Sequence, residues 1–512
     1  MIQIDGNNLT LEDLAAVARG GEPVSLSAEG IQAILTAQGY LEEIRATDQP
    51  VYGINTGFGI FADQRIHRQD SARLSRNLIL SHAVGTGPAL PADVVRAAML
   101  VRANTLTKGL SGVRVEIVET LLEMINKGVT PIIPEQGSLG SSGDLLPLSH
   151  MALVFTTDEL DREEDSGWAE YKGRLMSGKQ AMTEAGLKRI VLGAKEGLAV
   201  NNGATFSAAI AALAVLDAEK LLDTAEAVLA LSLEAVMGCS SAFDARIHQA
   251  RGQVGQLKVA ERVRNLTQNS TLIDRTGRIQ DAYSLRCAPQ VQGAARDTVA
   301  FVRSVIEKEL NAATDNPLIV GRGEVLSGGN FHGEPVGMVM DYLGIAMAEV
   351  AAISERRIFR LTDGKLNAGL PPMLVDHPEA AGLNSGLMMP QYTAASLVLE
   401  SQTLATPDSV HSLPTSGEQE DHNANSMTAA RHAAKIMRNT AHVLAIELYT
   451  AARAVDLRLR LLPEARLGRQ TQLLHEIVRK QVAYQAGDAW WGPEIEKVRE
   501  LIDAGLCRMV EL

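Results

Sequence analysis

The amino-acid sequence predicts a mainly α-helical protein whose core is a bundle of long helices. The chain has 512 residues, and only 4% of them are aromatic. Alanine and leucine dominate many stretches, which favours helices over sheets because both residues have a high helix propensity. Helices of about thirty residues in a globular chain usually pack side by side, so the long helical patterns indicate a bundle.

The long helical patterns lie after residue 200, and breaks that contain glycine or proline separate them. These breaks lie at 314–317, 327–335, 369–372 and 413–417. The helices predicted between them cover 204–237, 292–313, 335–361, 390–404, 425–457 and 471–485. Residues 201–512 are therefore predicted to form the long-helix bundle.

Residues 1–200 are predicted to form an N-terminal region of shorter helices and loops. Thr10-Leu-Glu-Asp13 has the pattern of a capping box at the start of a short amphipathic helix. A glycine-rich segment at 51–59 is expected to be a mobile surface loop. The charged segment 157–194 is expected to be an exposed excursion with a small hairpin. Further helices are predicted at 28–46, 70–81, 91–107 and 113–127.

Composition and charge exclude several classes of partner. The chain carries 48 Lys and Arg against 61 Asp and Glu, a net charge of −13, so neither nucleic acid nor an anionic membrane is an expected partner. The longest uncharged run, 197–216, is interrupted by polar residues and is predicted to be a buried helix rather than a membrane span. Three widely spaced cysteines show no pairing or metal pattern, so a cytoplasmic protein with reduced thiols is expected.

A glycine- and serine-rich stretch, Gly137-Ser-Leu-Gly-Ser-Ser-Gly-Asp-Leu145, lies at the centre of the functional prediction. Glycine tolerates positive φ, so this segment can fold tightly just before the apolar helix predicted after it. One interpretation is a loop followed by a helix N-cap. A second is a phosphate cradle, which we consider weak because no Gly-Lys-Ser/Thr follows and no apolar strand precedes the first glycine.

Other breaks carry polar residues that a helical core would not contain without a reason. Each is a weak signal alone, because a single histidine is usually a cap or a hydrogen-bonded core residue. The cluster Glu420-Asp-His422 has no cysteine or histidine partner at metal-ligand spacing, so no metal site is predicted. The polar breaks contain His82, Asn202, Gln280, Tyr283, Arg286, Phe331 and Glu420.

Taken together, these segments resemble the aromatic amino acid ammonia-lyases and aminomutases, a family that cyclises an internal Ala-Ser-Gly into 4-methylidene-imidazol-5-one (MIO). The matching strings keep the family's order from about residue 50 to about residue 430. They are Tyr-Gly-Ile-Asn-Thr-Gly-Phe-Gly, the glycine- and serine-rich stretch, Glu-Gly-Leu-Ala…Asn-Gly, Tyr-Ser-Leu-Arg-Cys…Pro-Gln, Asp-Asn-Pro, Gly-Asn-Phe-His-Gly-Glu-Pro and Gln-Glu-Asp-His. The resemblance implies an MIO cofactor formed from Ser141-Ser142-Gly143, with Ser141 where Ala is usual.

The resemblance also implies how ring formation and catalysis use the chain. Cyclisation joins the Gly143 nitrogen to the carbonyl of residue 141, and water is lost from the Ser142 side chain. Tyr52 would be the catalytic base, on a mobile inner loop where a positive helix end would lower its pKa.

The remaining site residues are implied to act on the substrate or the ring. Arg286 would bind the substrate carboxylate, with Tyr283 near the ring and the leaving amine. Asn202 and Gln280 would hydrogen-bond the MIO oxygen or the carboxylate, and Phe331 would pack near the reaction centre.

Substrate choice is predicted to depend on His82 and Glu420. An imidazole ring needs hydrogen-bond partners, and these two side chains provide them, whereas an apolar ring would leave a carboxylate unpaired at a cost of a few kcal/mol. We therefore expect elimination of ammonia from L-histidine to give trans-urocanate.

Departures near the expected pocket leave alternatives open. A phenylalanine or tyrosine lyase, an aminomutase, or a lyase of a histidine betaine without MIO would keep the fold, while an inactive helical assembly protein or a nucleotide-binding protein would lack the activity. The family pattern also implies a homotetramer whose active sites draw on three subunits. The departures are Asn201, Ala204, Glu418 and the additional Asn423-Ala424.

Overall fold

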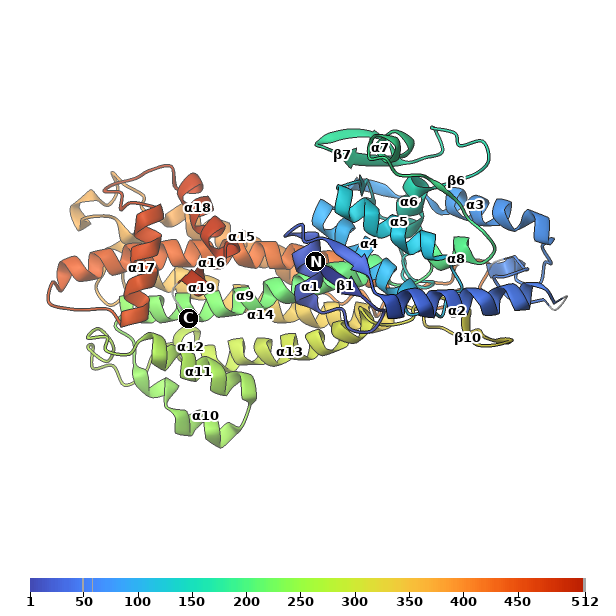
Figure 1. The fold of residues 1–512 in the computed structure, drawn as a ribbon. Helices are drawn as coiled ribbons and strands as arrows, with labels where there is room; N and C mark the ends of the chain where they lie inside the picture. The colour runs from blue at the N-terminus through green and yellow to red at the C-terminus, as the bar shows by residue number, and fades with distance from the viewer. Residues whose placement is uncertain (48–49, 58, 510–512) are drawn as a thin grey trace. The chain divides into compact units, whose positions relative to one another are not determined.

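A computed structural model describes residues 1–47, 50–57 and 59–509 of the protein (Figure 1). The chain forms two compact units. Unit 1 contains Met1–Ala214, Arg303–Asp341 and Pro407–Arg431, and unit 2 contains Val215–Val302, Tyr342–Thr406 and His432–Leu512. The boundary near residue 200 that the sequence suggests stays a prediction.

Unit 1 begins with a strand, a capped helix and a second strand. Strand β1 (Ile2–Ile4) pairs in parallel with β2 (Val24–Leu26), and α1 (Leu11–Ala18) lies between them in sequence. The Thr10 hydroxyl accepts a hydrogen bond from the Asp13 N–H at 3.0 Å, which confirms the predicted cap at the start of α1. The Asp13 carboxylate accepts from the Thr10 hydroxyl at 2.6 Å, whereas in a full capping box it would accept from the backbone N–H of Thr10.

Helices of moderate length form the core of unit 1. Helix α4 (Ala92–Thr107) is buried along nearly all of its length and packs against α1 and α5 (Val115–Lys127). This burial explains why apolar residues are not confined to one stripe of α4, and why buried polar side chains such as Arg102 and Asn104 are hydrogen-bonded. The other helices of this region are α2 (Ala28–Arg45), α3 (Ser71–His82), α6 (Leu145–Phe155) and α8 (Glu196–Asn201).

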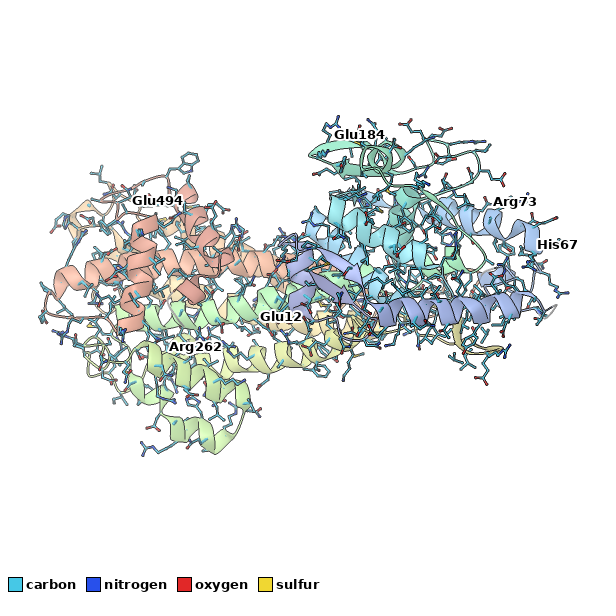
Figure 2. The ribbon with its side chains drawn as sticks, in the orientation of Figure 1. Glu12, His67, Arg73, Glu184, Arg262 and Glu494 are labelled. Atoms are coloured by element: carbon cyan, nitrogen blue, oxygen red, sulfur yellow. The ribbon has the colours of Figure 1, made fainter. Side chains whose placement is uncertain are left out.

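The excursion predicted at 157–194 contains the expected hairpin. Strands β7 (Trp168–Tyr171) and β8 (Arg174–Ser177) pair antiparallel, and β4 (Thr130–Pro131) joins β7 at its other edge. Helix α7 (Gly178–Glu184) follows β8, and Glu184 at its end, labelled in Figure 2, pairs with Arg174 at 2.5 Å. The remaining strands of unit 1 are β3 (Thr86–Ala89), β5 (Pro134–Gln136), β6 (Thr156–Thr157), β9 (Ile190–Val191), β10 (Leu318–Gly321) and β11 (Glu324–Leu326).

The predicted long helices are present, which confirms the mainly α-helical class. The division into units falls within α9 (Thr205–Ala235), α13 (Ala288–Glu309), α14 (Glu334–Thr362) and α16 (Ser426–Leu461), so each contributes residues to both units. The helices that belong wholly to unit 2 are α10 (Ala245–Arg251), α11 (Val254–Leu266), α12 (Tyr283–Arg286), α15 (Met388–Leu404), α17 (Arg469–Gln481), α18 (Trp491–Asp503) and α19 (Leu506–Met509).

Within unit 2, helices α14, α15 and α16 pack through small and β-branched side chains. Helix α18 adds a polar contact, because the Tyr449 hydroxyl on α16 donates to Glu494, which is labelled in Figure 2, at 2.6 Å. Among the described helices, α14 is long and apolar enough to cross a membrane, but 67% of its most apolar window is buried within the fold, as in a core helix. The apolar cluster consists of Ala351, Ile358, Ala394, Val398, Val443 and Ile446.

A buried carboxylate links three helices of unit 2. Glu447 on α16 and Arg357 on α14 are both fully buried, and Arg357 Nη2 donates to Glu447 at 2.8 Å. Ser232 on α9 and Ser354 on α14 donate to the same carboxylate at 2.8 and 2.5 Å. Because both charges are removed from water, their mutual pairing is needed to offset the cost of burial.

We expect Glu447→Gln to destabilise unit 2 by about 3–5 kcal/mol, because it leaves the Arg357 guanidinium buried without a counter-charge. Thermal and urea unfolding would measure the change. Glu496→Ala, which removes a solvent-exposed partner of Arg499, is the control and should scarcely alter the unfolding midpoint. Equal midpoints for Glu447→Gln and the unmodified protein would show that the buried pair does not stabilise the bundle.

Candidate active site

The glycine- and serine-rich stretch forms a tight turn between β5 and α6. Gly140 and Gly143 have φ values of +74° and +75°, in the left-handed region. A Cβ on Gly143 would lie 2.1 Å from the backbone carbon of Gly203, closer than any side chain could approach. Backbone therefore contacts backbone at this point, and glycine is required at position 143.

Two N–H groups hold the carbonyl of Ser142. Asn202 Nδ2 donates to this oxygen at 2.8 Å, and the Gly203 N–H donates to it at 3.2 Å. In return, the Asp144 N–H donates to the Gly203 carbonyl at 2.9 Å. The turn is thus fixed against the segment that joins α8 to α9.

Asp144 anchors the turn from beneath. Its fully buried carboxylate accepts hydrogen bonds from the Ser138 hydroxyl at 2.9 Å and from the Ser207 N–H at 2.8 Å. Burial is the largest influence and raises the pKa of Asp144, although these donors oppose the increase. Ser207 also donates to Ser426 at 3.0 Å, so the anchor includes a third segment of unit 1.

The carbonyls at the start of the turn are held by distant parts of the chain. The Gly333 N–H donates to the Gly140 carbonyl at 2.9 Å, and the Asn425 N–H donates to the Leu139 carbonyl at 2.7 Å. Asn425 directly follows Asn423-Ala424, the two residues that the family resemblance predicts to be additional. These residues therefore lie beside the turn rather than on a remote surface.

Glu420 contacts both serines of the turn. The Ser142 hydroxyl donates to Glu420 Oε1 at 2.7 Å, and the Ser141 hydroxyl donates to Glu420 Oε2 at 2.8 Å. A backbone bridge between Thr415 and Glu420 closes the loop that carries the carboxylate. A carboxylate thus lies directly on the two side chains that precede Gly143.

A cavity of about 1460 Å³ opens above this turn. It brings together many of the residues predicted from separate segments of the sequence. The predicted site residues that line it are Tyr52, His82, Ser141, Ser142, Asn202, Phe331 and Glu420. Tyr52 lies in the predicted loop 51–59, of which Phe58 lies outside the described residues.

Four predicted site residues are not among those that line this cavity. One of them, Gly143, packs instead against the Gly203 backbone, and the other three lie in unit 2. Gln280, Tyr283 and Arg286 belong to unit 2, and Tyr283 is 70% exposed. The Arg286 guanidinium lies 4.7 Å from the centroid of the Tyr283 ring, and its Nε is buried without a hydrogen-bond partner in the described part of the chain. Their roles in the site stay predictions.

Several polar residues that line the cavity have no role predicted from the sequence. Asn77 precedes Ser81 by about one turn of α3, but nothing else in the sequence marks it. Asn316 belongs to the Asp-Asn-Pro string, and His422 to the Gln-Glu-Asp-His string, so both could have been selected from their motifs. The rings of His332 and His422 stack with centroids 5.8 Å apart.

The expected lowering of the Tyr52 pKa is wrong. Burial, the largest influence, and the Glu420 carboxylate raise the pKa of the phenol above 10.0, and the opposing hydrogen bond from the Gly59 N–H is weaker. Both burial and a nearby negative charge disfavour phenolate, so the surroundings oppose rather than promote its ionisation.

The surroundings of His82 at the cavity wall favour its neutral form. Burial is the main cause that lowers the pKa of His82, while the Leu78 carbonyl and Glu420 oppose the decrease. Its Nδ1 lies 3.0 Å from the Ser81 hydroxyl. A neutral imidazole can offer one donor and one acceptor nitrogen, which suits recognition of a polar ring.

The chain belongs to the aromatic amino acid lyase family, whose model matches residues 9–480. It is therefore an enzyme, a carbon–nitrogen lyase. The histidine ammonia-lyase of Caldanaerobacter subterraneus is 47% identical over 509 residues, covering 99% of this chain and 95% of that protein. The histidine ammonia-lyase of Treponema denticola is 45% identical and covers 98% of this chain and 96% of its own length.

Solved structures in the same family include both lyases and aminomutases. The histidine ammonia-lyase of Trypanosoma cruzi is 36% identical, with a TM-score of 0.90 over 100% of this chain and 95% of that one. The tyrosine aminomutase of Streptomyces globisporus is 34% identical, with a TM-score of 0.92 over 99% and 98% of the two chains. The fold is thus shared by enzymes with different outcomes.

The residues of the turn fit the MIO group of this family. Gly143 has the left-handed backbone and the close packing that bring its nitrogen into a tight turn with residue 141. The Ser142 carbonyl, whose oxygen the ring would keep, accepts two N–H groups that would draw electron density from it. Among the described residues, no group of three His, Cys, Asp or Glu side chains is arranged to hold a metal ion.

We expect Gly143→Ala to prevent ring formation, because its Cβ would collide with the Gly203 backbone and its φ would be strained. Intact mass spectrometry should detect the loss of two water molecules in the unmodified protein and no loss in the variant. Gly128→Ala is the matched control, since Gly128 has a φ of +76° but open space around it. Normal water loss in Gly143→Ala would contradict the turn as the site of cyclisation.

Proposed function

We propose that this enzyme eliminates ammonia from L-histidine to give trans-urocanate. The observation that carries this proposal is the presence of the His82 imidazole and the Glu420 carboxylate on the wall of one cavity. An imidazole ring can use both as hydrogen-bond partners. Once ring formation removes the Ser142 hydroxyl, a phenyl ring would offer no donor to Glu420 Oε1, and an unsatisfied buried acceptor costs about 1–3 kcal/mol.

We propose that Ser141-Ser142-Gly143 matures to MIO, which supplies the electrophile that standard side chains lack. Asn202 and Gly203 would hold the ring through the Ser142 carbonyl oxygen, where they already donate hydrogen bonds. Asp144 would keep the turn in place through Ser138 and Ser207.

Tyr52 is the proposed base that removes the β-proton of the substrate. It lines the same cavity as Ser142 and Glu420. Its raised pKa means that the phenolate becomes more abundant as the pH increases into the alkaline range. Phe331 lines the cavity as well and is proposed to limit the space around the reacting carbons.

Arg286, Tyr283 and Gln280 are proposed to reach the active site from neighbouring copies of the chain in a homotetramer. The exposed Tyr283 supports this proposal, because a large aromatic ring at 70% exposure leaves apolar surface in water. The cavity volume of about 1460 Å³ also exceeds the roughly 300–1,000 Å³ typical of small-ligand sites. Within the tetramer, Arg286 would bind the substrate carboxylate through its guanidinium fork.

An aminomutase is the second candidate, and the likeness to aminomutases over the whole chain supports it. A mutase would return the amine to the β-carbon, so its product would be a β-amino acid rather than urocanate.

The proposed location of the enzyme is the cytoplasm. The three unpaired cysteines of the described structure support this location, because the cytoplasm keeps thiols reduced.

The direct test is to mix the purified protein with L-histidine and follow the near-ultraviolet absorbance of urocanate. We expect absorbance growth in the unmodified protein and a loss of at least about 1,000-fold in Ser142→Ala, because the electrophile cannot form. Ser177→Ala, which removes the cap of α7 and a hydrogen bond to Glu163 but does not line the cavity, is the control and should retain activity. Activity that persists in Ser142→Ala would refute the MIO chemistry, and a β-amino acid product would favour the aminomutase.

The pH dependence of kcat/KM tests Tyr52 as the base. The Glu420 charge raises the pKa of Tyr52, so Glu420→Gln should lower that pKa and generate phenolate at lower pH. The rise of kcat/KM with increasing pH should therefore move to lower pH in Glu420→Gln, although the absolute rate falls. A rise that stays in place, or that moves to higher pH, would exclude Tyr52 as the group that controls it.

A further inference from the structure

Ser141 occupies the position where the family usually has alanine, and its hydroxyl makes a specific contact. The side chain is 7% exposed, and its Oγ donates to Glu420 Oε2 at 2.8 Å. The other carboxylate oxygen, Oε1, accepts from Ser142 at 2.7 Å. The Thr415 hydroxyl approaches Oε2 only at 3.4 Å, so the two serines are the close donors to Glu420.

Ring formation affects these two donors differently. Cyclisation joins the Gly143 nitrogen to the Ser141 carbonyl carbon and releases one water molecule. The second water carries away the Ser142 Oγ, so the donor to Glu420 Oε1 is lost. The Ser141 side chain takes no part in either step, and its hydroxyl remains available to Glu420 Oε2.

We infer that Ser141 is a positioning residue: its hydroxyl holds one oxygen of Glu420 so that the other oxygen is free to bind the imidazole ring of the ligand. This inference rests on the proposed function. A glutamate side chain has three rotatable bonds, and fixing it in the binding orientation before the ligand arrives lowers the entropic cost of recognition. A chain with alanine at this position lacks that tether.

The inference predicts a loss of ring-specific affinity when the hydroxyl is removed. A hydrogen bond to a charged group contributes about 1.5–3 kcal/mol, so loss of the tether should weaken imidazole binding by at least about tenfold. Binding of a phenyl ring should not change, because that ring makes no hydrogen bond with Glu420. A role in structure alone would weaken both ligands together.

The test measures the binding of urocanate and cinnamate by isothermal titration calorimetry. These ligands share the acrylate group and differ in the ring. We expect Ser141→Ala to weaken urocanate by about tenfold or more, to leave cinnamate unchanged, and Ser141→Thr to restore much of the urocanate affinity. Ser409→Ala is the matched control, because Ser409 is a buried serine that donates to a carboxylate, that of Asp341, outside the cavity.

A double-mutant cycle tests whether the effect passes through Glu420. In a Glu420→Ala background, Ser141→Ala should cause no further loss of urocanate affinity, because the carboxylate that it holds is absent. Intact mass spectrometry of each variant, which does not depend on activity, should show equal loss of two water molecules in Ser141→Ala and the unmodified protein.

Distinct results would overturn the inference. Equal urocanate affinity in Ser141→Ala and the unmodified protein, or an undiminished effect in the Glu420→Ala background, would remove Ser141 from recognition and leave the proposed function intact. Reduced water loss in Ser141→Ala would assign the residue to ring maturation instead. Failure of the unmodified protein both to bind urocanate and to convert L-histidine would refute the proposed function together with this role.

Discussion

The close approach of Gly143 to Gly203 is the constraint on which the site depends. A Cβ on Gly143 would collide with the Gly203 backbone, and a Cβ on Gly203 would collide with Thr314. Glycine is therefore required at both positions for the two backbones to meet. This approach brings the Ser142 carbonyl within reach of Asn202 and fixes the start of α6 relative to the start of α9. The turn, the electrophile proposed to form from it and the wall of the cavity therefore depend on the same packing contact.

The two carboxylates at the turn, Asp144 and Glu420, differ in their burial and in their hydrogen-bond partners. Asp144 is fully buried beneath the turn and is satisfied by serine and backbone donors, so it acts on geometry. Glu420 is half-buried at the cavity and can exchange a serine partner for a ligand. The same chemical group thus supports the scaffold in one place and recognition in the other, and the difference lies in access to the cavity.

Much of the fold could be predicted because long periodic patterns are reliable signals. The pattern at 204–237 corresponds to α9, and that at 425–457 to most of α16. The short helices α10 and α18 were missed, since mixed polar sequences of this length become helical through tertiary contacts. Strands such as β6, two residues long, carry no periodicity that a sequence could reveal.

The site residues were predicted mainly from the order of the motifs along the chain, rather than from the chemical properties of each short segment. Motif order selected Glu420 and Ser142, but their contact joins residues 278 positions apart, which no local pattern encodes. The sequence predicted a role for the carbonyl of Ser141 but none for its hydroxyl, because the contact of that hydroxyl with Glu420 also joins distant segments. The direction of the Tyr52 pKa shift was wrong because it depends on burial and on Glu420, both of which are properties of the folded chain.

The turn is held by residues that are synthesised long after it. Its carbonyls and its buried aspartate depend on Gly333, Asn425 and Ser426, which follow Ser142 by nearly three hundred positions at the farthest. A nascent or misfolded chain therefore cannot assemble this geometry. Formation of the proposed electrophile would therefore require these late segments to be in place, so an incomplete chain would not carry the reactive group.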